Sequence, residues 1–134
     1  MRAKNFLALD VGEKRIGLAM ADNQVRIAVP FGWVENDDQV MMNLAEIILR
    51  HHISRVIVGY PRNQSGQPTQ QTEFVVQFTR RLRELELNIA INYQDESLTS
   101  VQARQRLGQA VAHKGDIDAE AASIILQDYL EAME

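Results

Sequence analysis

Apolar and polar positions divide the chain into short apolar runs and longer stretches with helical periodicity. A short run of apolar and β-branched residues bounded by Gly, Asp or Asn is typical of a buried strand. Five runs of this kind are predicted as strands, and the first three follow one another with only short turns between them. They cover residues 6–12, 16–21, 25–34, 55–60 and 88–93.

The remaining apolar residues recur at the spacing of amphipathic helices. One helix is predicted to begin near Asp37, and further helices are predicted over Thr69–Leu87 and Thr99–Leu107. Residues 108–115 are expected to form a flexible connection to a final helix. Asp118 precedes the apolar positions of that last helix and is a suitable N-cap for it.

This order of elements predicts an α/β fold with a mixed five-stranded sheet flanked by helices. Consecutive strands favour an antiparallel three-strand meander, and the later strands, which alternate with helices, favour two parallel strands reached by crossovers. The length of 134 residues suits a single domain over 1–134. In such sheets, sites gather at the carboxyl ends of the parallel strands.

Acidic residues occur at or near these expected strand ends. Asp10 ends the first strand, Asp95 and Glu96 follow the fifth, and Asp116 and Asp118 lie at the start of the last helix. Carboxylate oxygens brought together in this way are the ligands that Mg²⁺ or Mn²⁺ prefers. Each acid also has a simpler interpretation: Asp10 as a turn residue, Glu96 and Asp116 as solvated charges, and Asp118 as a helix cap.

Two loops carry residues suited to phosphate binding. Residues 10–17 have the form D-x-G-x-x-x-x-G, with Lys14 and Arg15 beside the first carboxylate, although a hairpin tip has the same form. The polar loop over 61–68 carries Arg62. Lys114 precedes the last acidic pair, where it could neutralise a phosphate or simply be solvated.

Composition narrows the chemistry further. The chain has no Cys, which excludes disulfides and thiolate metal sites and favours the cytoplasm, and it has no signal-peptide pattern. The net charge of −4 is unusual for a dedicated nucleic-acid-binding module. Positive charge is nevertheless concentrated in residues 50–115, which carry nine basic and five acidic side chains.

Four ordered motifs resemble those of one known family. They are L-D-V-G-x-K-R-I-G at 9–17, G-Y-P-R-N-x-x-G at 59–66, D-E-S-L-T-S at 95–100 and K-G-D-I-D-A-E-A-A-S-I-I-L-Q at 114–127. Together they resemble the YqgF family, also called RuvX, across the whole chain. That family is similar to RuvC-type Holliday-junction resolvases, has an RNase H-like fold, and is associated with maturation of the small-subunit ribosomal RNA precursor.

The resemblance implies a hydrolase that cleaves phosphodiester bonds, with Asp10, Glu96 and Asp118 as catalytic acids that bind Mg²⁺ or Mn²⁺. It favours Asp118 over Asp116, because the family's acid directly precedes a run of small residues. The expected substrate is structured nucleic acid, most specifically the 5′ end of the 16S ribosomal RNA precursor. Its backbone would be positioned by basic side chains, which are Lys14, Arg15, Arg62 and Lys114.

The chain departs from the family pattern at two places. Ser97 stands where the family commonly has Arg, and the connection from Leu107 to Lys114 is short. Neither departure affects the three acids.

Other functions remain open at this point. The chain could resolve branched DNA, or it could be a non-catalytic ribosome-assembly factor that only binds nucleic acid. The first loop also resembles the phosphate loop of the sugar-kinase, actin and chaperone ATPases, but those proteins need a second lobe. The sequence does not distinguish a monomer from a homodimer.

Overall fold

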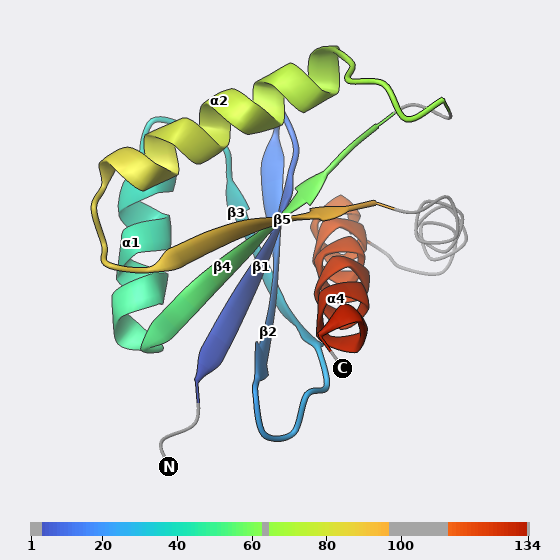
Figure 1. The fold of residues 1–134 in the computed structure, drawn as a ribbon. Helices are drawn as coiled ribbons and strands as arrows, with labels where there is room; N and C mark the ends of the chain where they lie inside the picture. Colours follow the sequence, from blue (N-terminus) through green and yellow to red (C-terminus); the bar gives the residue numbers. More distant parts are fainter. Residues whose placement is uncertain (1–3, 63–64, 97–112, 134) are drawn as a thin grey trace.

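The computed structural model describes residues 4–62, 65–96 and 113–133, and its centre is one five-stranded sheet. The strand order across the sheet is β3-β2-β1-β4-β5, so β1 is the middle strand. Helices cover both faces of the sheet (Figure 1). In chain order the elements are β1 (Asn5–Val11), β2 (Arg15–Asp22), β3 (Val29–Glu35), α1 (Val40–Arg50), β4 (Ile53–Tyr60), α2 (Gln70–Glu84), β5 (Ala90–Asp95) and α4 (Lys114–Ala132).

Strand pairing confirms the predicted mixed sheet. β1 is antiparallel to β2, and β2 is antiparallel to β3, which is the expected meander. β4 runs parallel to β1, and β5 runs parallel to β4. The carboxyl ends of β1, β4 and β5 therefore lie at one edge of the sheet, as the parallel pairing requires.

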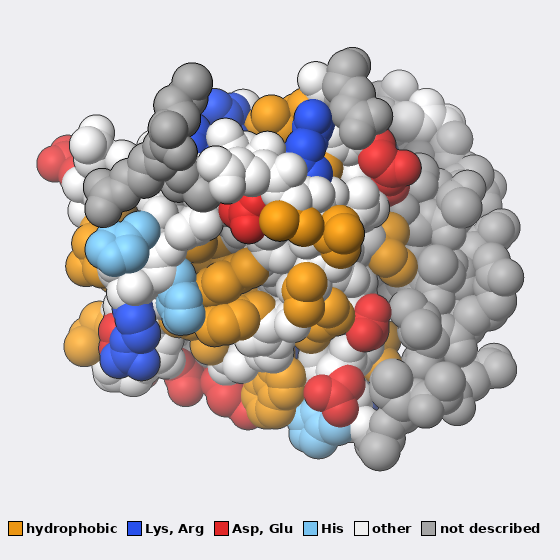
Figure 2. Space-filling view, turned by 90° about the horizontal axis from the view of Figure 1, so that it is seen from below, with side chains coloured by type: hydrophobic (Ala, Val, Ile, Leu, Met, Phe, Trp, Pro, Cys, Tyr) orange, Lys and Arg blue, Asp and Glu red, His pale blue; other side chains and the backbone are white. Residues whose placement is uncertain are grey.

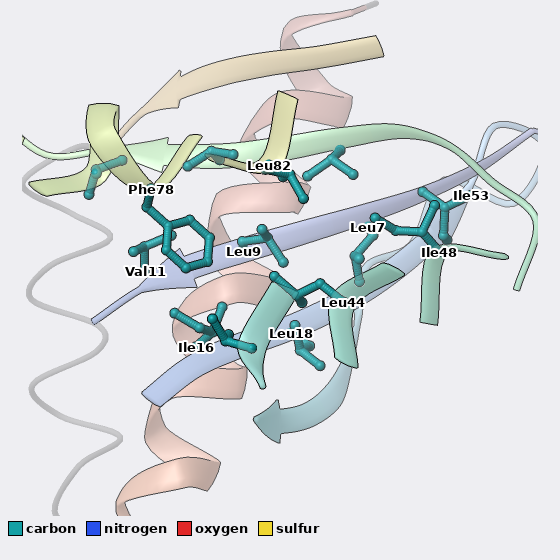
Figure 3. Close-up of a cluster of buried hydrophobic side chains, with 14 residues drawn as sticks. Leu7, Leu9, Val11, Ile16, Leu18, Leu44, Ile48, Ile53, Phe78 and Leu82 are labelled. Carbon is teal, nitrogen blue, oxygen red and sulfur yellow. The ribbon is translucent and has the colours of Figure 1, made fainter. Parts of the chain in front are cut away.

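Alternate residues of β1 pack on opposite faces of the sheet. Leu7 and Leu9 belong to a core shared with α1 and α2, which includes Leu44 and Phe78 (Figure 3). Phe6 and Ala8 belong to a second core on the α4 face, where the helix contributes apolar side chains. These are Ala122, Ile125, Leu126 and Leu130. Because successive strand side chains point to opposite faces, Asp10 lies on the α4 face.

The helices form where the apolar spacing predicts them. In α1 the buried residues Val40, Leu44 and Ile48 recur every four positions, which places them on one face of the helix. α2 begins with a capping box, in which the side chains of Thr69 and Thr72 each accept a hydrogen bond from the other's backbone N–H. The helix predicted over 99–107 and most of the connection predicted over 108–115 lie outside the described residues.

The third strand begins later than predicted, at Val29 instead of Val25. The Asp22 carboxylate accepts the backbone N–H groups of Gln24 and Val25, at 2.9 and 2.7 Å, and so stabilises a turn. Further on, the Ala28 N–H donates to the side chain of Gln127 in α4 at 3.0 Å. These local and tertiary hydrogen bonds satisfy backbone groups that the predicted strand would have paired with β2.

The fifth strand is also shifted, because the predicted start at Asn88 falls in the turn after α2. Glu86 and Asn88 have φ of 51° and 58°, in the left-handed region that neither a helix nor a strand uses. The helix therefore ends at Glu84, short of the predicted Leu87, and β5 begins at Ala90.

The last helix begins one turn earlier than predicted, so Asp118 is not its N-cap. Lys114 is the first residue of α4, and His113 caps it by accepting the Gly115 N–H through Nδ1 at 2.8 Å. Gly115 was expected in a flexible connection, but it is buried against Trp33, whose ring stacks on the ring of His113. Because of this packing, the helix begins earlier in the sequence than the position that capping preference alone favours.

Candidate active site

Asp10 stands near the carboxyl end of the middle strand with a glycine opposite it. Its partner in β2 is Gly17, and Gly59 in β4 follows Val58, the partner of Leu9. Because these two glycines have no side chain, other groups approach the sheet closely on either side of Asp10. Two acidic residues are among those groups.

Asp118 comes close to the sheet through Gly17. A Cβ atom on Gly17 would meet the backbone oxygen of Asp118 at 2.0 Å, a distance that no side chain can tolerate. Only glycine allows this close approach of helix and strand. The second turn of α4 is thus held directly against the strand that pairs with Asp10.

Glu96 directly follows β5 and comes close to the sheet through Gly59. The backbone N–H of Glu96 donates to the Tyr60 carbonyl at 3.2 Å, which continues the pairing of β4 with β5. A Cβ atom on Gly59 would lie 3.1 Å from Glu96 Oε1. The Glu96 carboxylate therefore lies over Gly59, which stands beside Asp10 on the neighbouring strand.

The three acids line one pocket of about 240 Å³ at the carboxyl end of the parallel strands. Asp10 and Glu96 come from strands and Asp118 comes from α4, so three distant parts of the sequence meet there. Asp116, by contrast, is exposed in the first turn of α4 and does not line the pocket. The full lining consists of Asp10, Val11, Gly12, Gly59, Pro61, Gln71, Val75, Glu96 and Asp118.

Asp118 makes an ion pair with a residue from the D-x-G loop. Arg15 Nε donates to Asp118 Oδ2 at 2.9 Å, and the two side chains are only 21% and 26% exposed. Arg15 is the first residue of β2, and on alternation it lies on the same face as Gly17. One of the predicted phosphate-binding cations is therefore bound to one of the predicted metal-binding acids.

The donor set of the pocket fits a hard divalent cation such as Mg²⁺ or Mn²⁺, because three carboxylates supply oxygen ligands. The ligands are not assembled in advance, however. Among residues 4–62, 65–96 and 113–133, no three Asp, Glu, His or Cys side chains are gathered closely enough to hold an ion. An ion bound here would have to draw the carboxylates together.

The other predicted basic residues have different surroundings. Lys14 is exposed in the turn after β1, and Lys114 is exposed at the start of α4. Arg62 is engaged within its own region: its Nε donates to Asp95 Oδ1 at 3.0 Å, and its guanidinium lies 4.6 Å from the centre of the Tyr60 ring. None of the three lines the acidic pocket.

Two amides that the sequence did not single out stabilise the turn after β1. Gln71 Nε2 donates to the Val11 carbonyl at 3.0 Å, and Asn36 Nδ2 donates to the Gly12 carbonyl at 2.9 Å. The two carbonyls belong to the two residues that follow Asp10. Gln71 could have been noticed in the sequence, because it lies in the first turn of the helix that follows the second polar loop. Nothing in the sequence around Asn36 indicated its contact with Gly12.

A larger pocket, of about 500 Å³, lies at the opposite end of β1 and β2 and contains none of the predicted site residues. Its lining includes apolar side chains that are also well exposed, among them Val25, Ile27 and Val29. Figure 2 views the molecule from below and shows hydrophobic side chains gathered there, with histidines beside them. The three predicted acids line the smaller pocket, at the other end of β1.

The fold matches that of RuvC. The structure of Thermus thermophilus RuvC in complex with a Holliday junction substrate aligns with a TM-score of 0.61 and 16% identity, over 96% of this chain and 95% of that chain. A second Thermus thermophilus RuvC structure aligns with a TM-score of 0.57 and 14% identity. The predicted RNase H-like fold is therefore confirmed.

Sequence comparison identifies the family. The family model RuvX, described as Holliday junction resolvase, matches residues 4–132. A protein of Chloroflexus aurantiacus named "Putative pre-16S rRNA nuclease" is 40% identical over 98% of this chain and 90% of its own length. A protein of the same name from Synechocystis is 34% identical over 93% of this chain and 86% of its own. The chain belongs to the RuvX family, as the four motifs indicated.

None of the helices in the described part of the chain is both long enough and apolar enough to cross a membrane.

Proposed function

We propose that this chain is a metal-dependent endonuclease that hydrolyses phosphodiester bonds in structured nucleic acid, acting as one RNase H-like domain over residues 1–134. The observation that carries the proposal is the meeting of Asp10, Glu96 and Asp118 around one pocket. Membership of a nuclease and resolvase family supports the same chemistry. The three carboxylates would hold Mg²⁺ or Mn²⁺, which polarises the phosphoryl group and activates water when bound.

The surrounding residues have separate roles in this proposal. Across the sheet, Asp10 lies between the positions of the other two acids. It would therefore be the central ligand of the ion. Gln71 and Asn36 fix the turn that follows Asp10, through its two carbonyls. Lys14, Arg15 and Lys114 would attract and position the phosphate backbone, and Arg62 would contribute after release from Asp95.

The proposed substrate is the precursor of 16S ribosomal RNA at its 5′ end, and the cytoplasm follows from that substrate. The support is the name shared by relatives that are 34–40% identical to this chain over 86–90% of their own length. Branched DNA is the second candidate, because the family description is Holliday junction resolvase. A non-catalytic assembly factor is the third, favoured by the net charge of −4 and by Ser97, which lies outside the described residues.

A parallel assay distinguishes the three candidates. Labelled ribosomal RNA precursor and a four-way DNA junction are incubated with the protein in Mg²⁺, Mn²⁺ or EDTA, and binding is measured on the same samples over a range of salt concentrations. Metal-dependent cutting of the precursor alone supports the first candidate, and cutting of the junction alone supports the second. Salt-sensitive binding without cutting in either metal would favour the assembly factor and overturn the nuclease.

A further inference from the structure

Arg15 and Asp118 are 103 positions apart in the sequence, yet their side chains form an ion pair at the edge of the acidic pocket. Arg15 comes from the first position of β2 and Asp118 from the second turn of α4. Both side chains are largely buried, but about a fifth of the Arg15 side chain remains exposed at 21%. The Arg15 side chain is therefore partly open to solvent.

The ion pair occupies part of the ligand set that the proposed function requires. One oxygen of Asp118 accepts the Arg15 Nε–H, and in the described part of the chain no three acidic or imidazole side chains are close enough to hold an ion. The Arg15 guanidinium also offsets the negative charge of Asp118, which a divalent ion would otherwise have to do. Arg15 and the ion thus compete for Asp118.

The guanidinium suits the alternative partner equally well. Arg presents five N–H donors in a planar fork and binds phosphate oxygens in pairs. Lys14, the adjacent cation, is exposed and does not line the pocket. Of these two neighbours, Arg15 is the one that forms the ion pair with Asp118.

We propose that Arg15 exchanges partners when nucleic acid binds, leaving Asp118 for a backbone phosphate and thereby releasing the carboxylate for the divalent ion. Nucleic acid would then raise the affinity of the pocket for metal, and metal would raise the affinity for nucleic acid by the same factor. The inference rests on the proposed function and adds a regulatory property to it. Arg15 is a positioning residue in this account, since it acts through Asp118.

The test measures Mn²⁺ binding to the full chain by the loss of the free-ion electron paramagnetic resonance signal. Wild type, Arg15→Gln, Arg15→Lys and Arg80→Gln are titrated alone and with a phosphorothioate RNA stem-loop or four-way DNA junction, whose own Mn²⁺ binding is subtracted. Arg80→Gln removes the same charge from an exposed position of α2 outside the pocket lining, and Asp10→Asn reports whether binding occurs in the pocket. Circular dichroism confirms that each variant is folded.

Wild type is expected to bind Mn²⁺ about three- to tenfold more tightly when the oligonucleotide is present, the range expected for release of one partly buried ion pair. Arg15→Gln should bind Mn²⁺ more tightly than wild type without oligonucleotide and should lose most of the enhancement. Arg15→Lys should restore part of it, and Arg80→Gln should keep it.

Three results would overturn the inference. Unchanged Mn²⁺ affinity in Arg15→Gln, with binding still lost in Asp10→Asn, would refute the exchange and leave the nuclease proposal intact. Equal effects of Arg15→Gln and Arg80→Gln would reduce the role of Arg15 to general charge. Mn²⁺ binding that is absent, or that persists in Asp10→Asn, would refute the metal site and the exchange together.

Discussion

Gly17 of β2 and Asp118 of α4 lie so close together that a methyl group on the glycine would stand 2.0 Å from the backbone oxygen of the aspartate. The same glycine is the cross-strand partner of Asp10. One missing side chain therefore allows helix and sheet to bring two carboxylates to the same pocket. The second glycine of the D-x-G-x-x-x-x-G motif determines how closely α4 can approach the sheet. This is a physical reason for a glycine at that position of the motif.

Gly17→Ala is expected to destabilise the protein by about 2 kcal/mol or more, because backbone must move to relieve the overlap. It should also weaken Mn²⁺ binding, since Asp118 moves away from Asp10. Urea unfolding and Mn²⁺ titration measure the two effects. Gly32→Ala is the control: Gly32 has open space but φ of 89°, so the variant should lose about 1 kcal/mol and keep its metal affinity. A stable Gly17→Ala variant with normal Mn²⁺ affinity would contradict the account.

Asp118 and Asp116 are two positions apart on α4, but only Asp118 lines the pocket, so Asp116 is a matched control. Asp118→Asn is expected to lower kcat/KM for cleavage by about 100-fold or more, because a proposed metal ligand is lost. Asp116→Asn should stay within about threefold of wild type, as an exposed surface charge does. Steady-state cleavage kinetics decide between them. Equal losses in the two variants would show that charge, and not ligation, is responsible.

Lys14 and Lys114 are expected to act on the nucleic-acid backbone through charge alone. Each is exposed, and Lys114 stands at the positive end of the α4 dipole, where a cation does not stabilise the helix. Lys14→Gln and Lys114→Gln should each reduce the slope of log affinity against log salt by about 1. Arg80→Gln, an exposed charge on α2, serves as the control and should leave the slope unchanged. Unaltered slopes for both lysine variants would show that the nucleic-acid backbone does not bind near Lys14 or Lys114.

Thr72 connects the start of α2 to the pocket wall. Its side chain is 2% exposed, accepts the Thr69 N–H and donates to the carbonyl of Pro61, which lines the pocket. Thr72→Val should cost about 1–3 kcal/mol, because buried polar groups lose their partners. Thr79→Val is the control, since Thr79 is equally buried but bonds only within α2, to the Val75 carbonyl. In thermal unfolding, Thr72→Val should have a lower Tm than Thr79→Val. The reverse order would argue against a stabilising link between α2 and the pocket wall through Thr72.

The sheet and its two faces follow from local pattern. The apolar runs predict the strands, and alternation along β1 assigns Asp10 to one face before any contact is known. The meander and the crossovers then fix which strand ends meet. For this reason the edge of the sheet that carries the pocket was predictable from residues such as Asp10 and Glu96 alone.

Element boundaries were less predictable where tertiary contacts override local preference. The start of α4 depends on Gly115 packing against Trp33, two residues 82 positions apart that no local pattern connects. The late start of β3 depends on a hydrogen bond from Ala28 to the side chain of Gln127. Asp118 has the right chemistry for an N-cap, but the packing energy of an additional helical turn decides the position.

The pairing of Arg15 with Asp118 could not be predicted for the same reason. Sequence placed Arg15 beside Asp10 and suggested a phosphate contact, whereas its partner in the structure comes from the last helix. The motif identifies which residues carry charge near the pocket. Only the packed fold determines which of those charges touch.

The most direct test of the nuclease proposal is the cleavage rate of Asp10→Asn beside wild type and Asp116→Asn, on ribosomal RNA precursor and on a four-way junction, in Mn²⁺ and in EDTA. The account predicts metal-dependent cutting by wild type and Asp116→Asn, and none by a folded Asp10→Asn variant. Metal-dependent cutting retained by Asp10→Asn would contradict the assignment of the acidic pocket as the active site.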